Sequence, residues 1–271
     1  MQIDSSTTSP PIGVFDSGAG GLSIVAAIRN ALPAQSIVYY ADTAFAPYGP
    51  RSDQEILERT HFCCSRLLER GVAALVVACN TATANAIDEL RSWAPVPVVG
   101  VEPGLKPAAS VTRNGVVGVL ATRATLASRR YRDLLRRVSE QSPQVRFVEH
   151  AAHGWVELVE SGELDSAHAR GLVRQAVQAL TDEGADTLVL GCTHYPFLRR
   201  AIQATAKAAI IVETGPAIAR ELQRRLALAP RVAASSDAEL LQFEASGDRE
   251  RFAALAATLL AVTGIEPQGA I

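Results

Sequence analysis

Two cysteines occupy equivalent places in two similar segments of the chain. Residues 75–81 (LVVACNT) and 188–194 (LVLGCTH) are both apolar runs that end in a cysteine followed by polar residues. Open α/β sheets bind ligands beyond the carboxyl ends of their strands. A helix that begins just after each cysteine would lower the pKa of its thiol, so that thiolate becomes accessible. We therefore expect Cys79 and Cys192 to be reactive thiols that face each other across one cleft.

Facing thiols suit one kind of chemistry in particular. One thiolate can remove a proton from a carbon atom while the opposite thiol donates a proton to the other face, which inverts a stereocentre. The alternative is that each cysteine is only a small buried hydrophobic residue. The repeated position of Cys79 and Cys192 argues against that alternative. Cys63 and Cys64, inside a predicted helix over 53–70, are assigned to the core.

Each cysteine has polar residues near it that are candidates to orient it. Asp16 and Ser17 end the first predicted strand, on the Cys79 side. His194 lies two residues after Cys192, and Glu160 lies on an amphipathic segment over 156–160. Asp16 can instead be a turn residue that caps the following bend. His194 can instead be a helix-start residue that packs under the loop.

The glycine-rich bend at 18–21 is a candidate anion-binding element. It matches neither G-x-G-x-x-G nor the phosphate loop. We expect its backbone N–H groups to approach a small anion such as a carboxylate. Neutral hydrogen-bonding residues also fall at strand ends or helix starts: Asn80, Thr81, Thr122, Thr125 and Thr193. Together they predict a small zwitterionic ligand that carries carboxylates.

Other uses of these cysteines fit the sequence less well. A zinc site built from both cysteines, His194 and Asp16 lacks the close C-x-x-C or H-E-x-x-H spacing of zinc motifs. A redox role also lacks C-x-x-C, and neither cysteine has the arginine spacing of a cysteine phosphatase. Pyridoxal phosphate needs a Schiff-base lysine, and the two lysines, Lys106 and Lys207, lie away from the predicted strand ends. We expect a reaction without metal and without cofactor.

The elements that must position these residues alternate between strands and helices. Short apolar runs predict buried strands at 12–15, 37–41, 73–78, 96–99, 115–120, 187–190 and 210–212. Between them, as in 53–70, apolar residues recur at helical spacing. Strands that alternate with helices predict a doubly wound α/β fold, with a parallel sheet covered on both faces.

An internal repeat refines this prediction. The segment that begins at Gly13 resembles the segment that begins at Gly118, 105 residues later. The segment around Cys79 resembles the segment around Cys192, 113 residues later. We therefore expect two pseudo-symmetric doubly wound parallel-sheet domains with the site in the cleft between them. Residues 12–100 and 214–271 form the first, discontinuous domain, and 101–213 form the second. Residues 1–11 are predicted to be a flexible tail.

Composition excludes several classes of protein. The chain has 271 residues, of which 48% are hydrophobic, so it is long enough for a substantial core. Its 26 basic and 28 acidic residues argue against nucleic acid or an anionic membrane as the main partner. Four cysteines are too few for a disulfide scaffold. There is no signal-peptide pattern, and the apolar stretches are shorter than the ~20 residues of a membrane span. We expect a cytoplasmic protein.

Several motifs, in order, resemble one known family. They are GVFDSGAGGL at 13–22, ADT at 41–43 with PYG at 47–49, ACNTAT at 78–83 and LGCTHYP at 190–196. At these positions, and over residues 12 to about 264, the sequence is similar to the glutamate racemases of the aspartate/glutamate racemase superfamily.

The resemblance implies a function and the residues that carry it. It implies a cofactor-independent interconversion of L- and D-glutamate that supplies D-glutamate for peptidoglycan, often by a homodimer. Cys79 and Cys192 match the catalytic cysteines, while Asp16, His194 and Glu160 match the residues that assist them. The matching substrate-binding pairs are Asp16-Ser17, Tyr48-Gly49, Asn80-Thr81 and Thr193-His194. The alternatives are a racemase for aspartate or another acidic amino acid, and a non-catalytic amino-acid-binding module.

Overall fold

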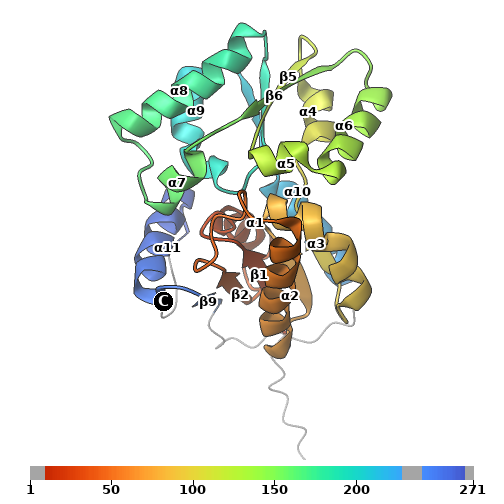
Figure 1. Ribbon diagram of the computed structural model, residues 1–271, viewed down its shortest axis with the longest axis vertical. Coiled ribbons are helices and arrows are strands. Elements are labelled where there is room, and N and C mark those ends of the chain that lie inside the picture. The colour runs from red at the N-terminus through yellow and green to blue at the C-terminus, as the bar shows by residue number, and fades with distance from the viewer. Residues whose placement is uncertain (1–9, 228–239, 266–271) are drawn as a thin grey trace, which may run out of the picture.

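The computed structural model describes residues 10–227 and 240–265 (Figure 1). Its strands form two separate, wholly parallel sheets. The five-stranded sheet has the order β4-β3-β1-β2-β9, and the four-stranded sheet has the order β6-β5-β7-β8. We call the parts that carry them the first and second domains. Read in reverse, the second order repeats the first four strands of the first sheet, which confirms the predicted fold class of two pseudo-symmetric doubly wound domains.

The strands of the two sheets come from different parts of the chain. The first sheet contains β1 (Ile12–Asp16), β2 (Ile37–Ala41), β3 (Ala74–Val77), β4 (Val98–Gly100) and β9 (Leu241–Ala245). The second contains β5 (Val116–Ala121), β6 (Arg146–Ala151), β7 (Thr187–Leu190) and β8 (Ile210–Val212). The domain boundaries at 100 and 214 stay a prediction, and the predicted tail lies almost wholly outside the described residues.

Helices connect these strands. In the first domain they are α1 (Leu22–Ala31), α2 (Asp53–Glu69), α3 (Asn80–Trp93), α10 (Gly215–Ala227) and α11 (Arg249–Thr263). In the second they are α4 (Leu105–Val111), α5 (Arg123–Ala127), α6 (Arg129–Gln141), α7 (Trp155–Glu160), α8 (Ala167–Asp182) and α9 (Arg199–Thr205), the last preceded by the 3₁₀ turn η1 (Tyr195–Leu198). The boundaries of α2 agree closely with the predicted helix over 53–70.

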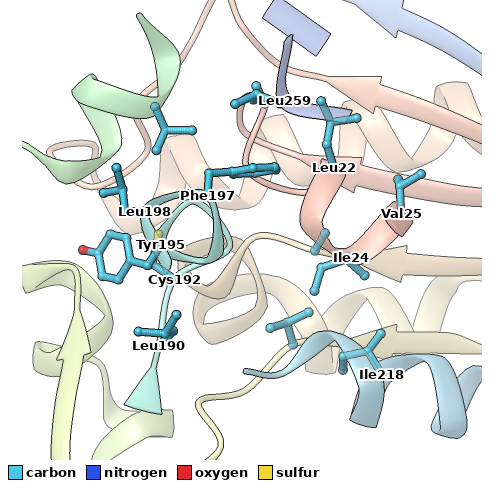
Figure 2. Close-up of a cluster of buried hydrophobic side chains, with 14 of the residues drawn as sticks. Leu22, Ile24, Val25, Leu190, Cys192, Tyr195, Phe197, Leu198, Ile218 and Leu259 are labelled. Atoms are coloured by element: carbon cyan, nitrogen blue, oxygen red, sulfur yellow. The ribbon is translucent and has the colours of Figure 1, made fainter. Parts of the chain in front are cut away.

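Both faces of each sheet are buried, as the continuous apolar strands predict. In β1, Ile12 and Val14 face one core cluster and Phe15 faces another, packed with residues of α2 and α3. The cluster that contains Ile12 continues into the second domain. There it includes Leu190, Tyr195 and Leu198 beside residues of α1 (Figure 2). The loop that carries Cys192 is therefore anchored in a core shared by the two domains.

Two strands, β6 and β9, were not predicted. β6 contains Arg146, Glu149 and His150, and β9 alternates Leu241, Gln242, Phe243 and Glu244. Both lie at an edge of their sheet, where part of the strand remains accessible and polar residues are tolerated. Such strands lack the continuous apolar run that identifies a strand buried on both faces.

Candidate active site

The predicted site residues follow the strands at the switch point of each sheet. β1 and β3 are neighbours from which the chain winds in opposite directions, and β5 and β7 are the corresponding pair in the second sheet. Asp16 ends β1, and Cys79 lies two residues beyond β3. Thr122 follows β5, and Cys192 lies two residues beyond β7. Doubly wound sheets form their ligand crevices beyond the carboxyl ends of such strands.

Cys79 is a buried thiol at the start of α3. Its sulfur accepts hydrogen bonds from the Ser17 hydroxyl and the Ala82 N–H, both at 3.4 Å, and Cys79 is therefore the N-cap of α3. Burial, and after it the Asp16 charge, raise the pKa of the Cys79 thiol to about 11, although these two hydrogen bonds lower it. The expectation of a lowered pKa for this thiol is wrong, because desolvation outweighs the helix terminus.

Cys192 has different neighbours. Its sulfur lies 3.6 Å from Nδ1 of His194, and Nε2 of the same ring lies 2.6 Å from Oε1 of Glu160. The predicted regular helix after Cys192 is wrong at its first turn, because the chain forms η1 with Pro196 near its start before α9 begins. Figure 2 shows Cys192 beside Tyr195 in the shared core.

The His194–Glu160 contact changes the protonation of both groups. Burial alone would lower the pKa of His194, but hydrogen bonds to Cys192 and Glu160 and the charges of both raise it well above its ordinary value. Burial would raise the pKa of Glu160, but the bond and charge of His194 together with the Ala19 N–H lower it. Neutral pH thus favours a protonated imidazole between a carboxylate and the Cys192 sulfur.

Asp16 contacts the loop of Cys192 and acts electrostatically on Cys79. Its carboxylate accepts hydrogen bonds from the Gly18 N–H at 2.8 Å and from the Thr193 hydroxyl at 3.1 Å, so it contacts the loop of Cys192. Burial raises the pKa of Asp16 to about 6, although the His194 charge opposes this. A charge on Cys192 also raises the pKa of Cys79, so the two sulfur atoms are near enough to interact electrostatically.

Asn80 supplies an unused hydrogen-bonding group beside Cys79. It is buried, and neither its amide nitrogen nor its amide oxygen has a partner in the described part of the chain. Asn80 and Thr125 line one small cavity together with residues of both domains. A buried amide without partners is costly, so it points to a bound ligand or water. Thr81, next along α3, is also buried.

The other predicted binding residues are placed less uniformly. Thr122 caps α5 by accepting the Thr125 N–H, and the two hydroxyl groups hydrogen-bond to each other at 3.0 Å. Tyr48 is buried and donates its hydroxyl to Asp42 at 2.6 Å, whereas Gly49 is exposed. The structure therefore brings Asp16, Ser17, Thr193 and His194 to the two cysteines. Tyr48 belongs to the same core cluster as Cys79, whereas Gly49 lies on the surface.

Arg59 and Asp42 form an ion pair that was not predicted, in which the carboxylate is buried and the arginine is partly exposed. The Arg59 guanidinium donates two hydrogen bonds to the Asp42 carboxylate, at 2.7 and 3.0 Å, and lies 3.8 Å from the ring centre of Phe45. Burial raises the pKa of Asp42, but Arg59 and Tyr48 together lower it. The sequence signal was an arginine on the apolar face of the predicted helix over 53–70, between Ile56 and Cys63.

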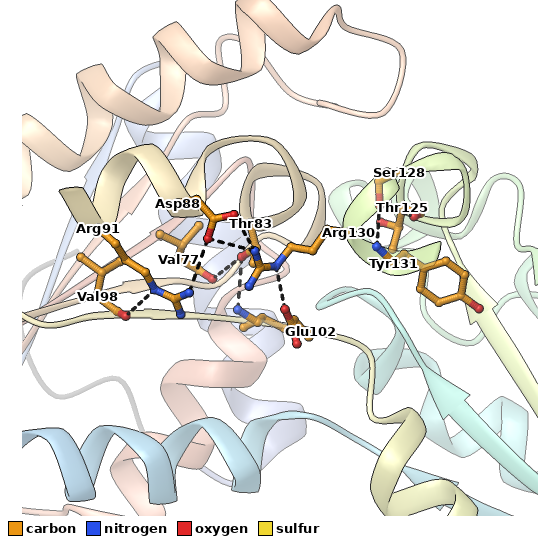
Figure 3. A network of polar contacts seen from close by, with 11 residues as sticks. Val77, Thr83, Asp88, Arg91, Val98, Glu102, Thr125, Ser128, Arg130 and Tyr131 are labelled. Atoms are coloured by element: carbon orange, nitrogen blue, oxygen red, sulfur yellow. Dashed lines mark hydrogen bonds and ion pairs between the residues drawn. The ribbon is translucent and has the colours of Figure 1, made fainter. Parts of the chain in front are cut away.

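A second polar network joins the domains near the crossover after β4 (Figure 3). Arg130 of α6 donates to Glu102 at 2.6 Å and to Asp88 of α3 at 3.0 Å. Because α3 begins at Asn80, this network links the helix that carries the Cys79 region to the second domain.

Within residues 10–227 and 240–265, no cluster of three or more His, Cys, Asp and Glu side chains is arranged to hold a metal ion. Over the same residues, no helix combines the length and the apolar character that crossing a membrane requires.

The chain has two parallel-sheet domains, and in each a cysteine lies beyond the carboxyl end of the third strand of the repeat. It is therefore a two-domain α/β protein with a paired-cysteine site. The family model of Asp/Glu/hydantoin racemases matches residues 12–222, and the chain belongs to this family.

Known relatives resemble the chain over most of its length. It is 47% identical over 244 residues to a glutamate racemase of Herpetosiphon aurantiacus, a match that covers 90% of this chain and 95% of the relative. The crystal structure of the Bacillus anthracis glutamate racemase isoform RacE1 superposes with a TM-score of 0.83 at 34% identity, covering 93% and 94% of the two chains. The Escherichia coli glutamate racemase, solved with L-glutamate and the activator UDP-MurNAc-ala, gives 0.82 at 33% identity, covering 95% and 96%.

Proposed function

We propose that this chain is a cofactor-independent glutamate racemase that interconverts L- and D-glutamate by proton transfer at Cα. The observation that carries the proposal is the pair of buried cysteines at equivalent strand ends, one beside Asp16 and one beside His194. The similarity to glutamate racemases, one of them solved with L-glutamate, supports the choice of substrate.

In the proposed reaction the two sulfur atoms act on opposite faces of Cα. The thiolate on one side removes the Cα proton and becomes a thiol. The thiol on the other side donates its proton to the opposite face and becomes a thiolate. The product is the other enantiomer, and no atom is gained or lost. Two acid/base groups in opposite protonation states are required, and the unlike surroundings of Cys79 and Cys192 supply that difference.

The Cα–H of an amino acid is a very weak acid, so the site has to stabilise a carbanion-like transition state. Positioned N–H and hydroxyl donors around the substrate carboxylates do this, and one such donor is worth ~3 kcal/mol. The unpartnered amide of Asn80 is the clearest candidate, because its NH₂ can donate to a carboxylate while its oxygen accepts from the ammonium group. Thr81, Thr122, Thr125 and Thr193 are the further donors we propose.

The proposed physiological role is the supply of D-glutamate for peptidoglycan in the cytoplasm. We also propose a homodimer, which sizing by light scattering would report as twice the chain mass of 28.7 kDa.

Circular dichroism of purified protein with L-glutamate, without added cofactor, tests the activity. We expect the signal to decay to zero from either enantiomer of glutamate, and much more slowly from either enantiomer of aspartate. Faster decay with aspartate would assign the enzyme to the other acidic substrate. Thermal stabilisation by glutamate with an unchanged signal would show a binding module instead.

A further inference from the structure

The glycine-rich bend between β1 and α1 contacts the acid/base groups of the other domain. The Ala19 N–H donates to Oε1 of Glu160 at 2.7 Å, and the same oxygen lies 2.6 Å from Nε2 of His194. The bend was predicted to receive a carboxylate through its backbone N–H groups. The carboxylate that it receives in the structure belongs to α7 of the second domain.

The glycines of this bend are explained by close approach and not by backbone conformation. Several glycines of the chain have positive φ, but Gly18, Gly20 and Gly21 are not among them. A Cβ on Gly18 would lie 2.9 Å from Cδ of Glu160 and closer still to its Oε1. A Cβ on Gly20 would lie 2.5 Å from Cε1 of His194 and closer still to Nδ1. A methyl group at either position would displace the side chain of the second domain.

Two hydroxyl groups support the bend, and one of them also joins it to the Cys192 loop. The Ser23 hydroxyl contacts the carbonyl oxygens of Gly20 at 2.9 Å and Thr193 at 2.8 Å, and so joins α1 to the residue between Cys192 and His194. The Tyr39 hydroxyl donates to the Gly18 carbonyl oxygen at 2.7 Å and supports the bend from β2. The bend is therefore held both by its own, first domain and by the second domain.

We propose that residues 18–21 form a carboxylate cradle, in which Gly18 and Gly20 are positioning residues that hold Glu160 and His194 beside Cys192. This inference rests on the proposed function. In this arrangement the first domain completes the acid/base group around Cys192. The Ala19 N–H comes from the first domain, whereas Cys192, His194 and Glu160 come from the second. Separation of the domains would release Glu160 from the cradle and leave His194 without its oriented partner.

The test compares Gly18→Ala with a matched control. Gly171, in α8, has ordinary backbone angles and open space around its Cα, so Gly171→Ala should leave the activity unchanged. Gly18→Ala should fold, because the added methyl group meets the end of a flexible side chain. We expect its kcat to fall about 10- to 100-fold, the effect of losing an oriented acid/base partner, with a smaller change in KM.

A double-mutant cycle shows whether Gly18 acts through Glu160. Once Glu160→Ala has removed the carboxylate, Gly18→Ala should cost no further activity, since nothing is left to displace. If the loss of kcat in the double variant equals the product of the losses in the two single variants, the cradle is overturned, and Gly18→Ala acts through the backbone.

NMR titration of the histidine side chains gives a readout that does not depend on turnover. We expect the pKa of His194 to fall toward its ordinary value in both Gly18→Ala and Glu160→Ala, and to stay unchanged in Gly171→Ala. An unchanged His194 titration in Gly18→Ala would also overturn the cradle. If the wild-type protein does not racemise glutamate, the proposed function fails, but this titration still decides whether the cradle exists.

Discussion

The surroundings of Cys79 and Cys192 differ although the backbone that presents them is repeated. Each follows the strand that pairs with the first strand of its sheet, and each is buried, with 6% and 7% of its surface exposed. Cys79 caps a helix of 14 residues and is bounded by a hydroxyl, a backbone N–H and the Asp16 charge. Cys192 precedes a 3₁₀ turn and contacts an imidazole supported by a carboxylate.

This difference shows that symmetry of fold and asymmetry of chemistry are compatible in one site. In identical surroundings nothing would select which of the two thiols carries the proton, and a racemase needs one protonated and one deprotonated group at the same time. Burial and the Asp16 charge favour the neutral thiol at Cys79. On the other side, His194, which the Glu160 carboxylate helps to keep protonated, places a positive charge beside the Cys192 sulfur.

The largest expected effect comes from removing either sulfur. Cys79→Ser and Cys192→Ser should each lower kcat at least ~10³-fold, because an alcohol is a far weaker acid than a thiol at the same position. Glutamate binding, measured by calorimetry, should be nearly unchanged. Cys64→Ala, in the core of α2, is the control that should keep its activity. Activity close to wild type in either serine variant would contradict the two-thiol account.

A smaller loss is expected when the partner of His194 loses its charge. Glu160→Gln should reduce kcat about 10- to 100-fold. The pKa of His194 is held above its ordinary value in part by this carboxylate, so His194 should lose its proton at a lower pH in the variant. The alkaline limb of the kcat/KM profile should therefore move to lower pH. If kcat/KM falls at every pH but both limbs of the profile keep their positions, Glu160 does not take part in the acid/base group.

Asp16 should affect stability in a way that depends on pH. Its pKa rises from 3.8 to about 6 on folding, so the folded state binds the proton more tightly than the unfolded state. Stability is then lost as the pH rises from about 4 to 6, and above 6 the ionised group costs about 3 kcal/mol. Urea unfolding should show that Asp16→Asn gains stability over wild type at pH 8 and gains less at pH 5.

Asp186 is a control of opposite sign for this measurement. Burial raises the pKa of Asp186, but hydrogen bonds from Thr112, Thr187 and two backbone N–H groups outweigh it, so the pKa is lowered on folding. Asp186→Asn should therefore lose stability, and lose more of it at pH 8 than at pH 3. The same change with pH in both variants would show that neither carboxylate is responsible.

The smallest expected effect concerns the ion pairs that link the Cys79 helix to the second domain. Arg130→Met should lower the free energy of unfolding by about 1 kcal/mol, because this arginine serves two carboxylates and is only partly exposed. Added salt should weaken the wild-type protein more than the variant. Arg132→Met, which removes a more exposed arginine that pairs with Glu149 alone, should have less effect. Equal effects would mean that the network contributes no more than an ordinary surface pair.

The sequence predicted the centre of each sheet and the residues at its switch point. Continuous apolar runs identified β1, β3, β5 and β7, and the internal repeat placed Cys79 and Cys192 at equivalent ends. The edge strands β6 and β9 escaped because polar residues interrupt their patterns. The wrong direction for the pKa of Cys79 has a similar origin, since the extent of burial depends on side chains from distant segments.

Contacts across the domain boundary were also beyond sequence reasoning. The spacing of Gly18, Ala19 and Gly20 indicated an anion, but it could not indicate that the anion was Glu160, 141 residues further along the chain. Arg59 shows the same limit, because two of its partners, Asp42 and Phe45, lie in a segment outside its own helix.

Deuterium incorporation tests the central claim most directly. L-glutamate is incubated with the enzyme in heavy water, the two enantiomers are separated by chiral chromatography at low conversion, and the deuterium at Cα of each is measured by mass spectrometry. Two thiols on opposite faces predict that newly formed D-glutamate carries deuterium at Cα while the remaining L-glutamate keeps its protium. D-glutamate that retains protium, or L-glutamate that gains deuterium as fast as product forms, would mean that a single base serves both faces.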